Sequence, residues 1–166
     1  MRYIAKLPDD KIPAFLDEMT RSVDRQEVNE VIQNPELLSQ LDDLMNDVVS
    51  DWGFDGLFYV HEACPIRLDR NLDPHADLNY INRYGLHSEP LLIVVGSEYG
   101  QQVKPDDGFG NYLYCHNMGM SEHLQRGDVI QFDATLPHAV MVSGEVRCVT
   151  LWLKPNLANQ RSWTRS

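Results

Sequence analysis

Apolar residues recur at three- and four-residue steps between Asn34 and Gly53, in the stretch NPELLSQLDDLMNDVVSDWG. Asn34 is a favourable N-cap residue, Pro35 suits the first helical turn, and Gly53 is a typical stop. The apolar positions that would share one face are Leu37, Leu41, Leu44 and Val48. The spacing predicts an amphipathic helix that packs this face against another element.

Two weaker patterns of the same kind precede it. The segment DDKIPAFLDEMTRSV (9–23) predicts a second helix with acidic residues near its start, and QEVNEVIQ (26–33) predicts a short third. Residues 1–53 are therefore interpreted as a helical layer.

After Gly53 the pattern changes to short β-rich runs separated by Gly, Pro, Asn and Asp. The runs are GLFYVHEA, PIRLD, LLIVVG, NYLYCHN, DVIQF, HAVMVS and VRCVTLWL. Many short strands with no helix between them indicate a sandwich, jelly roll or barrel. The predicted fold class is α+β, mainly β, with the N-terminal helices packed on one face. We expect a single domain over 1–166, with a helical layer (1–53), a β-core (54–155) and a tail (156–166).

Composition narrows the classes of partner. The net charge is -11 and the sequence pI is about 4.8. Nucleic acids and anionic membranes are polyanions, so neither is expected as a main partner. No secretion signal or membrane span is visible, which predicts a cytoplasmic protein. The three cysteines are odd in number and form no C-x-x-C pair, so they are interpreted as reduced thiols packed in the core.

Two His-x-acid pairs could bind a metal, His75-x-Asp77 and His87-x-Glu89. About one such pair is expected by chance from six histidines and 25 acidic residues in 166 positions, so neither is informative alone. His138 changes the interpretation because it follows the strand DVIQF and a turn and opens the strand HAVMVS. Two imidazoles and one carboxylate on neighbouring strands can form a facial triad, which leaves open positions on non-haem Fe(II).

Arg147 follows nine residues after His138, in the next predicted strand. A guanidinium at that place is predicted to reach into the same barrel, where it could bind a carboxylate through two hydrogen bonds.

The order His75-x-Asp77, LLIVVGS, GDVIQFDATLPHAV and Arg147 resembles the Fe(II)/2-oxoglutarate-dependent oxygenases, roughly over residues 57–154. The resemblance implies a double-stranded β-helix (jelly-roll) core, with Fe(II) bound by His75, Asp77 and His138. It also implies that Arg147 binds the far carboxylate of 2-oxoglutarate.

The second contact to that carboxylate is left open by the resemblance. Many relatives have a serine two residues beyond the arginine, where this chain has Val149. Tyr59, Arg67 and Tyr80 are the candidates that could replace it.

The predicted function is hydroxylation of an unidentified small-molecule or protein substrate. The helical layer and the loops around 78–90 and 100–112 are predicted to recognise it. A cupin-like metal protein is an alternative because Glu89 precedes an apolar strand and Gly96, although Arg83, Tyr84 and Gly85 stand where the cupin histidine pair belongs. A non-catalytic jelly-roll binding module is the other alternative.

Overall fold

The computed structural model describes residues 1–23, 32–49, 56–99 and 110–157, which form two antiparallel sheets. The large sheet has the strand order β1-β7-β4-β9-β2, and the small sheet has the order β3-β8-β5-β6. The large sheet contains β1 (Arg2–Lys6), β7 (Asp128–Gln131), β4 (Leu91–Glu98), β9 (Glu145–Pro155) and β2 (Phe58–Leu68). The small sheet contains β3 (Leu72–His75), β8 (His138–Met141), β5 (Tyr112–Cys115) and β6 (Gly119–Met120). The jelly-roll α+β fold class is confirmed.

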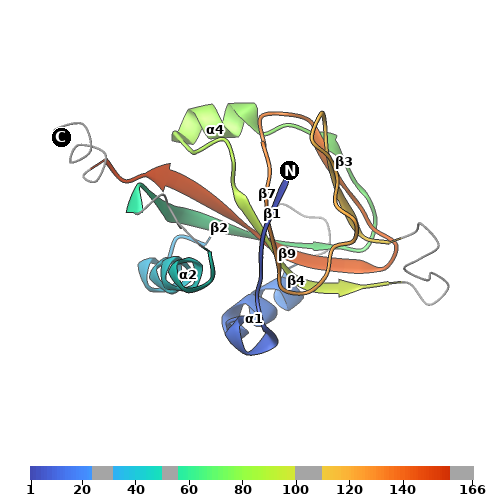
Figure 1. Ribbon diagram of the computed structural model, residues 1–166, viewed down its shortest axis with the longest axis horizontal. Coiled ribbons are helices and arrows are strands. Elements are labelled where there is room, and N and C mark those ends of the chain that lie inside the picture. The colour runs from blue at the N-terminus through green and yellow to red at the C-terminus, as the bar shows by residue number, and fades with distance from the viewer. Residues whose placement is uncertain (24–31, 50–55, 100–109, 158–166) are drawn as a thin grey trace.

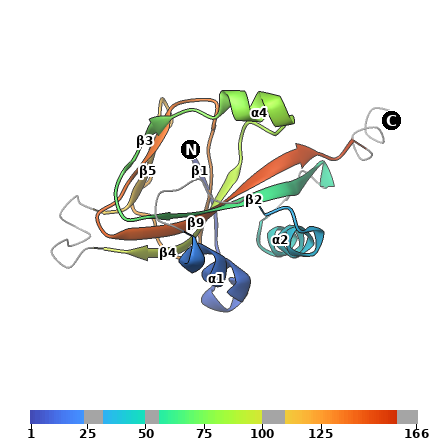
Figure 2. The same ribbon diagram turned by 180° about the vertical axis from the view of Figure 1, so that it is seen from behind.

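The helices α1 (Ala14–Ser22) and α2 (Pro35–Val48) cover the outer face of the large sheet (Figures 1 and 2). A short 3-10 turn, η1 (Asp9–Lys11), precedes α1. The predicted cap of α2 is confirmed, since the Asn34 side chain accepts hydrogen bonds from the N–H groups of Glu36 and Leu37. The helices pack against the apolar side chains on one face of the sheet, among them Val149, Leu151 and Leu153 of β9.

The opposite face of the large sheet packs against the small sheet and forms a second apolar cluster. Successive strand residues point to opposite faces, so β9 divides its side chains between the two clusters. Val146, Cys148 and Trp152 belong to the cluster between the sheets, called the interior face below. This division decides which β9 side chains can approach a site inside the barrel.

Three features of the fold differ from the sequence prediction. The helical layer is incomplete, because residues 2–6 form strand β1, which pairs with β7 at the edge of the large sheet. A helix, α4 (Leu78–Tyr84), follows directly after Asp77, where no helix is predicted. The runs GLFYVHEA and PIRLD form one strand, β2, with a shift of register between Val60 and Glu62.

The predicted third helix (26–33) lies outside the described residues except for its last two, where Ile32 forms an isolated β-bridge with Ala63.

Gly127, at the turn before β7, fixes the position of β1. Its φ is 93°, the Leu7 N–H donates to its carbonyl over 2.8 Å, and a Cβ added to it would meet the Leu7 carbonyl oxygen. Gly119 has nearly the same φ, 94°, but a Cβ there would meet nothing within 4 Å. The two glycines therefore differ in the space around them and hardly in backbone conformation.

We expect Gly119→Ala to cost about 1–3 kcal/mol of unfolding free energy through backbone strain alone. Gly127→Ala should cost at least about 1 kcal/mol more, because the added methyl group also displaces the Leu7 backbone. Urea unfolding of the two variants measures the difference. Equal costs would show that the β1 contact contributes nothing beyond the strain.

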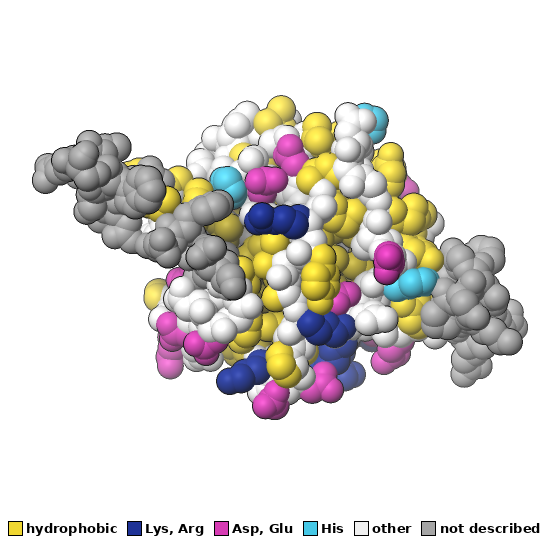
Figure 3. Space-filling model, in the orientation of Figure 1, with side chains coloured by type: hydrophobic (Ala, Val, Ile, Leu, Met, Phe, Trp, Pro, Cys, Tyr) yellow, Lys and Arg dark blue, Asp and Glu magenta, His cyan; other side chains and the backbone are white. Residues whose placement is uncertain are grey.

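The surface of the face seen in Figure 3 has hydrophobic side chains gathered near its centre, with acidic and basic side chains intermixed toward the lower edge. In the part of the chain that the structure describes, no helix has both the length and the apolar character needed to cross a membrane.

Candidate metal centre

Two histidines face each other at the edge of the small sheet. His75 ends β3, His138 begins β8, and the two are direct partners in the antiparallel register. Their ring centroids are 4.3 Å apart, with the planes tilted by 58°. The strand pairing therefore places the two imidazoles side by side, although they are far apart in sequence.

Asp77 completes the cluster from its place between the end of β3 and the start of α4. Its backbone N–H donates to the Ala134 carbonyl over 2.8 Å, which ties it to the turn between β7 and β8. Its carboxylate oxygens lie 3.0 Å from the His138 Nε2 and 3.9 Å from the His75 Nε2.

The candidate ligand atoms of His75, Asp77 and His138 all lie within 4.8 Å of one another. Two atoms bound to one metal at right angles, each about 2.1 Å from it, lie about 3.0 Å apart. The three predicted ligand side chains are thus gathered in one group that could hold a metal ion, and the more widely spaced atoms would move closer together around a bound ion.

The second nitrogen of each imidazole is held by the backbone. His75 Nδ1 lies 2.9 Å from the Asp73 carbonyl oxygen, and His138 Nδ1 lies 2.9 Å from the Leu136 carbonyl oxygen. A carbonyl can only accept, so both Nδ1 atoms carry the hydrogen. Each Nε2 is thereby left to face Asp77 with its lone pair, which is how metal-binding histidines are usually oriented.

The turn before His138 is stabilised by its own side chains. Asp133 accepts a hydrogen bond from the Thr135 N–H over 3.0 Å and another from the Thr135 hydroxyl. The Phe132 ring packs on the imidazole of His138, with centroids 4.9 Å apart. The stretch GDVIQFDATLPH therefore forms a strand and a fixed turn that place His138, as predicted.

Burial differs across the cluster. The side chain of His138 is 6% exposed, that of Asp77 is 26% exposed and that of His75 is 39% exposed. The cluster is closed on the His138 side and opens to solvent beside His75. A small molecule can therefore approach it from one side.

Arg147 does not join the cluster, and the prediction that it reaches into the barrel is wrong. Its guanidinium lies on the helix-covered face, where Nη1 is 3.2 Å from the Asp17 carboxylate and donates to the Thr20 hydroxyl over 2.9 Å. It also fills the space beside Gly96, which has no side chain. The cause is strand alternation, because Arg147 shares a face with Val149 while Val146 and Cys148 point inward.

The three candidates for the second carboxylate contact are not gathered at one place. Arg67, the direct register partner of Arg147, pairs with Glu145 over 3.1 Å and donates to the Arg21 carbonyl on α1. Tyr59 lines a separate surface pocket together with residues of α2. Of the three, only Tyr80 packs against the interior cluster, and its hydroxyl donates to the Glu62 carboxylate.

Two residues on the interior face of β2, Glu62 and Cys64, have no place in the predicted site. Burial raises the pKa of the Cys64 thiol to about 11, with further contributions from the charges of Glu62 and Asp77. Burial, then the hydrogen bond to Glu62 and its charge, raise the pKa of Tyr80. The thiol and the phenol are therefore uncharged at neutral pH. The period-2 alternation of β2 puts the two residues on one face, but the register shift after Val60 hides from the sequence that this face is the interior one.

The three cysteines are free, as predicted. Cys115 and Cys148 are buried, and burial raises their thiol pKa values to about 11 and about 12.

His87 and Glu89, which carry the cupin alternative, lie outside the cluster. The ring of His87 packs on Phe58 with centroids 4.6 Å apart, and burial lowers its pKa despite the nearby charge of Glu89. Within the described ranges, the group of His75, Asp77 and His138 is the one set of potential metal ligands that gathers. A cupin-type site containing His87 or Glu89 is not formed there.

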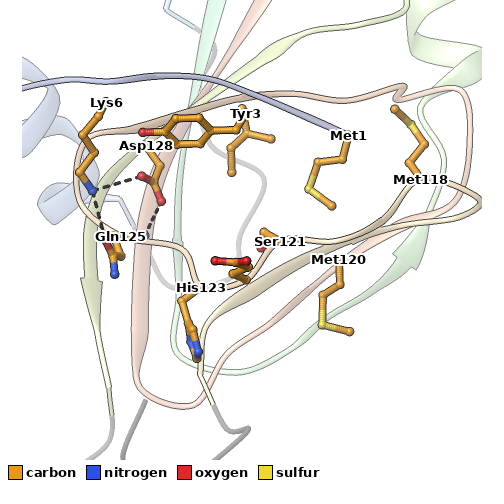
Figure 4. A pocket seen from close by; sticks show the side chains of 11 residues that line it. Met1, Tyr3, Lys6, Met118, Met120, Ser121, His123, Gln125 and Asp128 are labelled. Carbon is orange, nitrogen blue, oxygen red and sulfur yellow. Dashed lines mark hydrogen bonds and ion pairs between the residues drawn. The ribbon is translucent and has the colours of Figure 1, made fainter. Parts of the chain in front are cut away.

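A pocket of about 480 Å³ lies between β1 and the β5–β6 hairpin (Figure 4). The residues lining it include Met1, Tyr3, Met118, Met120 and His123. A Lys6–Asp128 ion pair of 3.1 Å crosses one side of it. None of the three clustered ligands lines this pocket, so it is separate from the candidate metal centre.

No protein-family model matches the sequence, and no curated protein sequence matches it. Solved structures do resemble the fold. A 2OG-Fe(II) oxygenase family oxidoreductase from Burkholderia pseudomallei aligns with 85% of this chain and 76% of its own, at 13% identity and a TM-score of 0.53. A prolyl-4-hydroxylase from Pseudomonas putida aligns with 89% of this chain and 82% of its own, at 19% identity and a TM-score of 0.47. A cupin-2 domain protein from Shewanella frigidimarina covers 89% of this chain and 97% of its own, at 12% identity and a TM-score of 0.42. At these identities the similarity is one of fold, and the Burkholderia oxygenase, with a TM-score above 0.5, is the structure that supports it.

Proposed function

We propose that His75, Asp77 and His138 bind Fe(II) and that the protein is a mononuclear non-haem iron oxidoreductase. The observation that carries the proposal is the coupling of two features. The ligand atoms gather around one point, and each histidine donates its Nδ1 hydrogen to a backbone carbonyl. Surface histidines and acids that meet by chance have no need of the second feature.

The donor set favours iron of this class. Two imidazoles and one carboxylate on one side of the metal leave coordination positions open for oxygen and a substrate. When bound, Fe(II) would supply the activation of O₂. The chain itself holds the three donors on a strand pair and a fixed turn, and packs Phe132 against His138 on the closed side.

The sequence resemblance implies a 2-oxoglutarate-dependent oxygenase. The ligand cluster supports its Fe(II), but the position of Arg147 does not support its co-substrate. The fold shared with the Burkholderia oxygenase supports an oxygenase. Arg147, however, is paired with Asp17 on the outer face, so the residues present do not fit 2-oxoglutarate in the predicted manner. This observation favours a second candidate, a jelly-roll metalloenzyme that works without 2-oxoglutarate. In either case the substrate is expected to be a small molecule or a protein.

Nitric oxide tests the open coordination positions directly. Anaerobic wild-type protein mixed with Fe(II) and then NO should give the electron paramagnetic resonance signal of a high-spin iron–nitrosyl complex. Asp77→Asn protein, treated in the same way, should give none above the signal of free iron. A wild-type spectrum indistinguishable from that of the variant would refute the proposed function.

A further inference from the structure

The barrel wall beside the metal cluster carries a second carboxylate. In the β2–β9 register, Glu62 is opposite Trp152 and Cys64 is opposite Thr150. Trp152 belongs to the interior cluster, so all four side chains face the inside of the barrel. Helix α4 connects this wall to the metal cluster, because it begins directly after Asp77 and carries Tyr80, whose hydroxyl donates to Glu62.

Glu62 is only 4% exposed, and its described hydrogen-bond partners are neutral. The Tyr80 hydroxyl donates to one carboxylate oxygen, and the Gln33 amide donates to the other over 3.3 Å. Burying a carboxylate without a cation is costly, and neutral donors compensate for only part of that cost. Glu62 is thus a buried acceptor for a positively charged group that the described chain does not provide.

The arginines nearby on β9 and β2 that could pair with Glu62 point away from the interior face. Arg147 and Arg67 are engaged with Asp17 and Glu145 on the helix-covered face. The inward positions of β9 are Val146, Cys148, Thr150 and Trp152, none of which is charged. The next cation on that side of the strand is Lys154, at the strand end beyond Trp152 and opposite Tyr59. A dianion such as 2-oxoglutarate bound at the metal would therefore face the Glu62 carboxylate on the interior face of β2 and β9, with no arginine there to bind it.

Aromatic rings accompany Glu62. Tyr80 packs edge-on against Trp152 with centroids 5.4 Å apart, and against Tyr84 with centroids 4.9 Å apart. Tyr84 is 45% exposed, so this row of rings runs from the solvent to the buried carboxylate. Aromatic faces attract ammonium and guanidinium groups, most strongly where water is excluded.

We infer that the metal site takes a substrate carrying a positively charged nitrogen group, bound by Glu62 and the aromatic row, and that it does not take 2-oxoglutarate. The inference rests on the proposed function, because it concerns a substrate that binds beside the metal ion.

Mn(II) can replace Fe(II) as a paramagnetic probe for this test. Protein loaded with Mn(II) is mixed with n-butylammonium, butan-1-ol or butyrate, which have the same four-carbon chain and differ in charge. The metal-induced relaxation of the ligand protons reports binding close to the metal. We expect n-butylammonium to bind at least about tenfold more tightly than the other two, and 2-oxoglutarate to give no competition. A charge-assisted hydrogen bond contributes about 1.5–3 kcal/mol, and each 1.4 kcal/mol is tenfold in affinity.

Glu62→Gln keeps the shape of the side chain and removes its charge, so it should weaken n-butylammonium binding by about tenfold or more while Mn(II) is retained. Glu18→Gln, on the exposed side of α1, makes the same change in net charge and should have no effect. Tighter binding of butyrate or 2-oxoglutarate than of n-butylammonium would overturn the inference, as would unchanged binding by Glu62→Gln. If wild-type protein does not retain Mn(II), the proposed function itself fails. The free Mn(II) signal distinguishes the two failures.

Discussion

His138→Ala should weaken Fe(II) or Mn(II) binding by more than about 100-fold. Loss of a group that only hydrogen-bonds a metal ligand usually costs about 10–100-fold in metal affinity, and His138 is expected to be a ligand itself. It is also the most buried member of the cluster, with 6% of its side chain exposed, so water cannot easily replace the lost imidazole. Anaerobic titration calorimetry of the variant and the wild type measures the loss.

Two control variants show whether the loss of metal affinity is specific to the cluster. His116→Ala removes an exposed histidine in the turn that follows β5 and should leave metal affinity unchanged. Asp77→Asn retains the size of the side chain, and should lose metal affinity while thermal unfolding shows an intact fold. Wild-type affinity in folded His138→Ala protein would contradict the assignment of the site.

Arg147→Ala should destabilise the fold by about 1.5–3 kcal/mol, because it removes a nearly buried guanidinium that bonds Asp17 and Thr20, while Asp17 keeps its ion pair with Arg126. Arg147 is only 7% exposed at its side chain and links β9 to α1 through Asp17 and Thr20. Arg67→Ala, at the paired position of β2, removes a more exposed arginine, 25% exposed at its side chain, and should cost about 1 kcal/mol or less. Urea unfolding measures both. Folded Arg147→Ala with wild-type stability would show that the contact with α1 is dispensable.

The same pair predicts a response to acid. Partial burial alone would raise the pKa of Asp17, but hydrogen bonds and charges from Arg126 and then Arg147 hold it below its ordinary value of 3.8. A lowered folded-state pKa means that the ionised carboxylate stabilises the fold fully above that ordinary value, and that this stability is lost as the pH falls through the folded-state pKa. Asp17→Asn should therefore lower stability at pH 7 and flatten its dependence on pH below about 4. An unchanged acid profile would show that the pair does not contribute.

The metal cluster could be predicted from the sequence because short local patterns of strand and turn residues mark the positions of its members. Asp128 and the apolar residues after it define a strand, and the turn ends at His138, whatever the rest of the fold does. For the three side chains to meet, His75 and Asp77 had only to lie at the end of a strand that pairs with the one opened by His138. The pairing of β3 with β8 then brings them together.

The location of Arg147 could not be predicted, because the face of a strand depends on its register. A shift of one residue exchanges the two faces. The sequence VRCVTLWL is apolar at most positions on both faces, so alternation does not show which side is inward. Only the contacts with α1 reveal that Arg147 faces the helices. Helix α4 was missed for a different reason, because its seven residues are too few for a clear period.

The position of Arg147 also changes how the resemblance is read. The order of His75, Asp77, His138 and Arg147 along the chain resembles an oxygenase pattern, yet three of the four share a site and the fourth contacts α1. Conversely, Glu62 has no place in that pattern and lies on the interior wall. Function at this site therefore has to be argued from side-chain direction as well as from sequence order.

One metal ion is expected to bind between the two histidines and the aspartate, and a crystal of the protein grown with Mn(II) tests this most directly. Anomalous scattering from manganese locates the ion without reference to the protein. The account predicts one strong peak within about 2.0–2.3 Å of His75 Nε2, His138 Nε2 and a carboxylate oxygen of Asp77. A peak at other side chains, or no peak at this cluster in a crystal saturated with Mn(II), would contradict it.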